Sequence, residues 1–239
     1  MKNLMIALIS ILTTTVFAAP ETKEFDSAGL TQVVIENTSG KVSVSASTGA
    51  KATVVATKNE FTDNCKMTLE KVSNKLILTV KSSGFFSSGN CAVDLDVKVP
   101  KSVDLDLSVG AGNLKVTGIE GALVFKVGAG DIAADGTFKN IDGKTGSGNI
   151  TVKGLSGGGE IRSGSGAVNL TFLKNMPKGE IDIKTGNGDA NLLFPKGSVI
   201  KTSYQTGVGQ MTNEFGDNPN AKFQVSMKSG SADLTIKSY

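Results

Sequence analysis

Apolar and polar residues alternate along most of the chain, and Gly-x-Gly turns interrupt the alternation again and again. A period of two is typical of a β-strand with one buried face, because successive side chains point to opposite sides of the strand. No helical periodicity of comparable strength occurs after residue 18. The pattern therefore predicts an all-β protein built from many short strands.

The Gly-x-Gly turns recur at a nearly constant interval. The first glycines of the first four copies are 18 residues apart, and the later intervals are 22, 21 and 23 residues, the last leading to a degraded copy at Gly230. Glycine permits backbone angles that other residues avoid, so each pair is predicted to form a corner between two strands. Constant spacing followed by small insertions indicates a β-solenoid with coils of about 18 residues. The predicted corner glycines are Gly110 and Gly112, Gly128 and Gly130, Gly146 and Gly148, Gly164 and Gly166, Gly186 and Gly188, and Gly207 and Gly209.

Alignment of the copies on their first glycine places apolar residues in common columns. One coil cannot bury such a face alone, so coils stacked about 4.8 Å apart are predicted to assemble a continuous core. The column four residues after the glycine contains Leu114, Ile132, Ile150, Val168, Ala190, Met211 and Leu234. The column three residues before it contains Leu107, Phe125, Gly143, Ile161, Ile183, Tyr204 and Met227.

Residues 19–100 are less regular than residues 101–239, and strands are predicted at 52–57, 75–81 and 93–99. We expect this part to form the first coils and a cap, because the open end of a solenoid invites edge-to-edge association. Residues 19–239 are therefore predicted to be a single β-solenoid domain, with residues 101–239 as its regular repeats.

The first 18 residues are typical of a signal peptide. Lys2 precedes an uncharged apolar run at 4–16, and Ala18 ends a small-residue cleavage site. That run is shorter than the roughly 20 residues that span a bilayer, and no later segment is long and apolar enough to do so. We expect an exported protein without a transmembrane segment, located in the periplasm, at the cell surface or outside the cell.

Charge and cysteine content narrow the class further. Without residues 1–18 the net charge falls by one, from +3 to +2, and Arg162 is the single arginine, so a nucleic-acid partner is not expected. Cys65 and Cys91 are predicted to form a structural disulfide, because export exposes them to an oxidising compartment and the chain has no histidine to complete a zinc site.

Several segments resemble the bacterial "putative adhesin" family. They are the strand–Asn-Thr-Ser-Gly–strand phrase at 33–44, the segment 94–100, the Lys-Thr-Gly-Ser-Gly-Asn-Ile-Thr-Val unit at 144–152, and the segment 192–195. The resemblance covers nearly all of the chain after residue 18. It implies a glycine-rich β-solenoid of unknown function, with no catalytic residue, cofactor or metal ligand to transfer.

Two outward-facing columns before the corners carry charges of opposite sign. Their central members are Asp142, Lys144, Glu160, Arg162, Asp182 and Lys184. One interpretation is a catalytic carboxylate pair, because stacked coils would hold Asp142 and Glu160 about 5 Å apart, as in retaining glycosidases. The other is a solvated face, in which neighbouring cations keep both carboxylates ionised, or one that recognises a polar or charged polymer.

Three further features of the sequence bear on function. Phe85 and Phe86, between the two cysteines, are predicted either to plug the end of the solenoid or to form a contact tip. The Asn and Asp residues after the corners are expected to bond to backbone groups, with a calcium site as the alternative. The Gly-x-Gly units are not expected to bind phosphate, because a strand rather than a helix follows each one.

The sequence thus favours an exported, non-catalytic, adhesin-like binding protein whose partner is an unidentified envelope polymer or protein. A carbohydrate-active enzyme using the face at Asp142, Glu160 and Asp182 is one alternative. A purely structural envelope component is the other.

Overall fold

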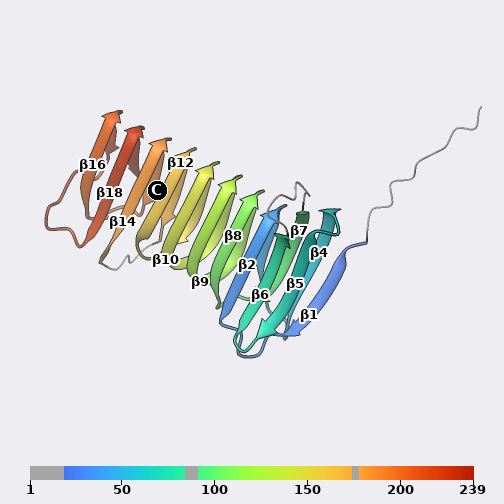
Figure 1. Cartoon of the computed structure of the whole chain (residues 1–239). Coiled ribbons are helices and arrows are strands. Elements are labelled where there is room, and N and C mark those ends of the chain that lie inside the picture. Colours follow the sequence, from blue (N-terminus) through green and yellow to red (C-terminus); the bar gives the residue numbers. More distant parts are fainter. Residues whose placement is uncertain (1–18, 84–90, 174–177) are drawn as a thin grey trace, which may run out of the picture.

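The computed structural model describes residues 19–83, 91–173 and 178–239. Within these ranges the fold is all-β, and 19 strands join in one sheet without a helix (Figure 1). In the same ranges no segment forms a helix of the length and hydropathy that a membrane crossing requires. The expected signal peptide and the pair Phe85 and Phe86 lie outside the described residues.

The strands form two rows that share the long strands β9 (Leu114–Ala129) and β10 (Ile132–Ser147). The first row runs in the spatial order β5 (Cys65–Val72), β6 (Lys75–Ser82), β2 (Gln32–Ser39), β8 (Asp104–Ala111), the second halves of β9 and β10, β12 (Gly159–Ser165), β14 (Gly179–Asn187), β18 (Phe223–Ser231) and β16 (Ile200–Val208). The second row runs in the order β1 (Glu21–Asp26), β4 (Lys51–Phe61), β7 (Cys91–Pro100), β3 (Val42–Ser47), the first halves of β9 and β10, β11 (Ile150–Leu155), β13 (Val168–Phe172), β15 (Ala190–Phe194), β19 (Leu234–Ser238) and β17 (Met211–Asn213).

Parallel pairing aligns residues that lie one sequence repeat apart. Ile132 pairs with Leu114 on one side and with Ile150 on the other, and Ile150 pairs with Val168. Each of these side chains is at most 1% exposed, because the alternation within every strand directs the same column inward. Apolar columns read from the sequence therefore lie on top of one another and form the core, except at the end strand β17, where Met211 of the same column is 43% exposed because no further coil covers it.

The N-terminal end departs from parallel stacking. β5 pairs with β6 in an antiparallel hairpin, while β1 and β7 flank β4 in antiparallel pairs. Five of the six residues of the edge strand β1 are exposed, and its carboxylates Glu21 and Glu24 form ion pairs with Lys58 and Lys51. Charged side chains on an edge strand discourage further strand addition, so this end has the properties of a cap.

The last two coils do not stack in the order of the sequence. β18 lies between β14 and β16 (Figure 1). In the second row, β19 lies in the same way between β15 and β17. The coil that starts at β18 is therefore interior, and the earlier coil that starts at β16 forms the end of the stack. Column alignment alone, which lists the copies in sequence order, does not reveal this exchange.

Aromatic side chains fill the core near this C-terminal end. The rings of Phe172 and Phe194 stack with centroids 4.2 Å apart, and Phe215 packs edge-on against Phe194 at 6.3 Å. The segment that carries Phe215 is tied to the edge strand β16, since the Thr202 amide N–H donates to Asp217. The segment after β17 thus covers the end of the core.

Candidate functional site

The charged residues predicted from the sequence lie side by side on the outer face of the first row. Parallel register aligns Asp142 with Glu160 and Glu160 with Asp182, and it aligns Lys144 with Arg162 and Arg162 with Lys184. We call these six residues the charged face. The alignment follows from the equal distance of each residue from its corner glycine.

Glu160 is the centre of an ion-pair network on this face. Arg162 donates to it through two nitrogens at 2.8 Å each, and Lys184 Nζ lies 2.7 Å from Glu160 Oε1. Lys184 also contacts Asp182 at 2.8 Å, so the network spans the strands β12 and β14. The four side chains remain 29–55% exposed, which identifies a solvated surface rather than an enclosed site.

The ion-pair network shifts the pKa values of Glu160, Arg162 and Lys184. Hydrogen bonds from Lys184 and then Arg162 lower the pKa of Glu160, because they favour the charged carboxylate. The pKa of Lys184 is raised by its hydrogen bonds to Asp182 and Glu160, and the pKa of Arg162 is raised by Glu160. These shifts keep Glu160 ionised, whereas a general acid requires a raised pKa.

The strand register places two more lysines in line with the three cations of the charged face. Lys126 pairs with Lys144 on one side, and Lys228 pairs with Lys184 on the other. Five successive positions therefore carry cations, and we call them the basic column: Lys126, Lys144, Arg162, Lys184 and Lys228. In the part of the chain that the structure describes, Lys126, Lys144 and Lys228 form no ion pair. The exchange of the last two coils is what brings Lys228 next to Lys184.

The corners show why glycine and Asx residues recur there. At Gly148 the backbone φ is 124°, and an added Cβ would lie 2.0 Å from the carbonyl oxygen of Gly130 in the neighbouring coil. Asn113 Oδ1 accepts the Asp131 N–H at 3.0 Å, and Asp131 Oδ1 accepts the Asn149 N–H at 2.8 Å. The Asx side chains therefore link one coil to the next. Among the described residues no cluster of His, Cys, Asp and Glu could hold a metal ion.

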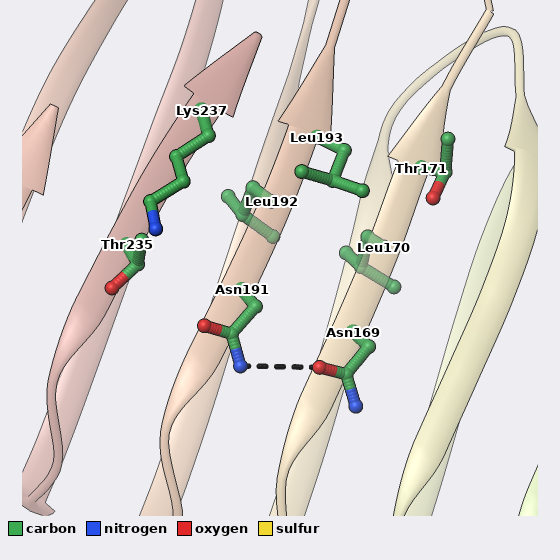
Figure 2. Close-up of a pocket in the computed structure, with 8 residues that line it drawn as sticks. All are labelled: Asn169, Leu170, Thr171, Asn191, Leu192, Leu193, Thr235 and Lys237. Atoms are coloured by element: carbon green, nitrogen blue, oxygen red, sulfur yellow. Dashed lines mark hydrogen bonds between the residues drawn. The ribbon is translucent and has the colours of Figure 1, made fainter. Parts of the chain in front are cut away.

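A second candidate site lies on the outer face of the second row, where sequence reasoning did not place one. Outward side chains of β13, β15 and β19 line a hollow of about 240 Å³ (Figure 2). We call it the amide hollow and define it by Asn169, Thr171, Asn191, Leu193, Thr235 and Lys237. The available sequence signal is the recurrence of Asn and Thr at the outward positions after successive corners.

The two cysteines form a disulfide, as predicted, with their Cα atoms 5.7 Å apart. The bond joins the start of the edge strand β5 in the first row to the start of β7 in the second row. It thus fastens the capping strands of the two rows to each other.

Residues 90–237 match the family model Toast_rack_N, described as the N-terminal domain of toast_rack, DUF2154. No curated protein matches the chain. Similar solved structures include a putative adhesin from Parabacteroides distasonis, with a TM-score of 0.46 and 12% identity over 92% of this chain and 97% of that one. A putative adhesin from Bacteroides fragilis has a TM-score of 0.45 and 14% identity over 92% and 97% of the two chains. A putative cell adhesion protein from Clostridium sporogenes has a TM-score of 0.40 and 15% identity over 92% and 99%.

Proposed function

We propose that this chain, which belongs to the family of toast_rack N-terminal domains, DUF2154, is a non-catalytic, adhesin-like binding protein of the bacterial envelope. In this proposal residues 19–239 form one β-solenoid domain, and the first row binds an extended anionic polymer along its charged face. The parallel register of residues one repeat apart supports the solenoid.

Two features support export to the periplasm or the cell surface. Residues 1–18 have the polarity and length of a signal peptide. The disulfide between Cys65 and Cys91 is of the kind that persists in oxidising compartments.

The observation that carries the proposal is the basic column. Five cations occupy successive coils about 4.8 Å apart, so the positive charge repeats along the stack instead of converging on one point. The adjacent outward column carries three carboxylates over the same coils, at Asp142, Glu160 and Asp182, so these two columns together have an excess of two positive charges. A linear polymer with regularly spaced negative charges matches such a row, and the exposed geometry suits a chain that lies across the surface.

The electrostatics of Glu160 favour binding over catalysis. A retaining glycosidase needs one carboxyl group with a raised pKa to protonate the leaving group. The pKa of Glu160 is instead lowered by Lys184 and Arg162, which hold it as a carboxylate. The same contacts fix the side chains of the two cations on the surface where a polymer would lie.

Binding of polygalacturonate, a linear polymer with one carboxylate per sugar, to the immobilised protein tests the proposal by surface plasmon resonance. We expect measurable binding that weakens as salt is added, because screening reduces attraction between exposed charges. The double variant Lys126→Gln/Lys144→Gln should lose about tenfold in affinity, equivalent to about 1.4 kcal/mol. These two lysines are exposed and take part in no described ion pair, so the fold should be retained.

A matched control comes from the second row, where Lys115 on β9 and Lys153 on β11 are exposed on the opposite face, on the two strands that flank β10. The double variant Lys115→Gln/Lys153→Gln removes the same charge and should leave binding close to wild type. Equal losses in both double variants would contradict a specific basic column. Release of reducing ends from the polymer that disappears in Glu160→Gln would contradict the non-catalytic assignment.

A further inference from the structure

The amide hollow presents hydrogen-bonding groups that the protein itself leaves partly unused. Asn191 Nδ2 donates to Asn169 Oδ1 at 3.1 Å (Figure 2). Within the described structure this bond leaves the Asn169 amide NH2 and the Asn191 amide oxygen without a protein partner. An amide can donate two hydrogen bonds and accept two, so the linked pair offers a donor at one end and an acceptor at the other.

Hydroxyl groups and one apolar side chain surround this amide pair. Register places Thr235 beside Asn191 and Thr171 beside Leu193. Leu193 is 37% exposed, which leaves an apolar platform between polar neighbours. Ligand sites characteristically combine an apolar contact surface with a few convergent polar groups.

The hollow carries little net charge. None of its lining side chains is a carboxylate, and Lys237 is its one cation. Glu214 lies close to that lysine: hydrogen bonds from Ser238 lower the pKa of Glu214, and the Lys237 charge lowers it further. An ionised carboxylate thus partly offsets the positive charge at the rim, in contrast to the basic column of the first row.

From these features we propose that the amide hollow is a binding site for a neutral saccharide. A sugar ring has hydroxyl groups at its edge, which both donate and accept, and apolar C–H groups on its face. The amides of Asn169 and Asn191 would bind neighbouring hydroxyls, and Leu193 would contact the ring face. This site goes beyond the polymer binding proposed for the first row, since it lies on the other row and requires no charge on the ligand.

Geometry also indicates how the saccharide lies. Asn169 and Asn191 occupy equivalent positions on adjacent parallel strands, about 4.8 Å apart. That spacing is comparable to the length of one sugar unit in an extended glycan. A short run of sugars parallel to the stacking axis would place successive hydroxyl groups beside successive coils.

The test uses four neutral tetrasaccharides, namely cellotetraose, maltotetraose, xylotetraose and tetra-N-acetylchitotetraose, added to isotopically labelled protein. Binding is followed by NMR through the side-chain amide signals of Asn169 and Asn191. We expect at least one saccharide to shift both signals in a saturable manner. Asn191→Ala and Leu193→Ala should each weaken that binding about tenfold or more. Both side chains are exposed, so the melting temperature should change little.

Two controls keep the outcome specific. Ser43→Ala alters the same outward column four coils away, and it should leave saccharide affinity unchanged. Lys126→Gln/Lys144→Gln should also leave it unchanged, because that variant affects the first row alone. The proposal is overturned if no saccharide in the panel shifts the two amide signals, or if Asn191→Ala and Leu193→Ala bind as wild type does. Either result would leave the polygalacturonate experiment unaffected.

Discussion

Replacing Gly143 with alanine should destabilise the protein, although its backbone conformation argues for the opposite sign. Gly143 does not have a positive φ. A glycine-to-alanine change at such a position ordinarily stabilises a protein by about 0.4–1 kcal/mol, because it restricts the unfolded chain. In this protein the packing of the neighbouring coil reverses that expectation.

The reason is the side chain of Phe125, which pairs with Gly143 across adjacent strands and is 1% exposed. A Cβ at position 143 would lie 2.3 Å from Cζ, 2.6 Å from Cε1 and 2.9 Å from Cε2 of that ring. The ring occupies the space that a side chain at 143 would need. Overpacking of this kind costs about 1–3 kcal/mol, and 2 kcal/mol in a domain of this size lowers the melting temperature by about 4–8 °C.

A double-mutant cycle isolates this contact. Leucine at position 125 lacks the three ring atoms that would clash, so Gly143→Ala should be neutral or stabilising in a Phe125→Leu background. The coupling between the two positions should be about 1–3 kcal/mol, with melting temperatures measured by circular dichroism for the four proteins. Gly49→Ala is the matched control, because its φ is not positive and its added Cβ would make only ordinary contacts of 3.4 Å or more. A rise in melting temperature for Gly143→Ala, or a coupling of zero, would refute the packing argument.

Three further outcomes are expected. Loss of the disulfide in Cys65→Ser/Cys91→Ser should cost about 3 kcal/mol in the chain-entropy model, so that a reductant lowers the melting temperature of the wild type but not of the variant. Asp131→Ala removes the acceptor of the Asn149 N–H and should cost about 1 kcal/mol in thermal unfolding, whereas Asp131→Asn keeps the acceptor and should be nearly neutral. Because the pKa of Glu160 is lowered in the folded protein, its carboxylate stabilises the fold above the unfolded value of about 4.3, and this contribution is lost as the pH falls through the folded value. The stability difference between wild type and Glu160→Gln should therefore be present at pH 7 and shrink in acid; a constant difference would contradict the assignment.

The repeat made much of this fold predictable. Period-two alternation identified the all-β class, and the distance to each corner glycine correctly aligned pairs such as Ile132 with Ile150. Strands predicted at 52–57, 75–81 and 93–99 lie within the longer β4, β6 and β7. The edge strand β1 was not predicted, because five of its six residues are exposed and its sequence carries no alternation of apolar and polar residues.

The order of the last coils was not predicted, since column alignment gives register but not neighbours. Val225 and Met227 of the interior coil are fully buried, and their register partners in the end coil are Thr202 and Tyr204. These two residues of the end coil are less apolar and only partly buried. An interior coil needs apolar side chains for neighbours on both sides, whereas an end coil has one neighbour, so the composition of the two coils accounts for the exchange.

The candidate sites differ in how far sequence alone could define them. The six residues of the charged face were predicted from their columns, and register places them together. Lys228 has the same spacing to its corner glycine as the other members of the basic column, and the coil exchange places it, instead of Gln205, next to Lys184. The amide hollow depends on how Asn169 and Asn191 bond to each other across coils, which is a property of side-chain geometry and not of spacing.

The exchanged coils also determine when the structure can be completed as the chain is delivered from its N-terminus. From residue 104 to residue 194, each new coil can dock as soon as it emerges on a coil that has already been made. Residues 200–213 cannot form their final strand pairings at that stage, because their partner strands β18 and β19 are made later. These two strands have to enter between residues 200–213 and the existing stack. Residues 223–238 thus complete the stack, and a chain truncated before residue 223 would leave β14 and β15 without their partner strands β18 and β19.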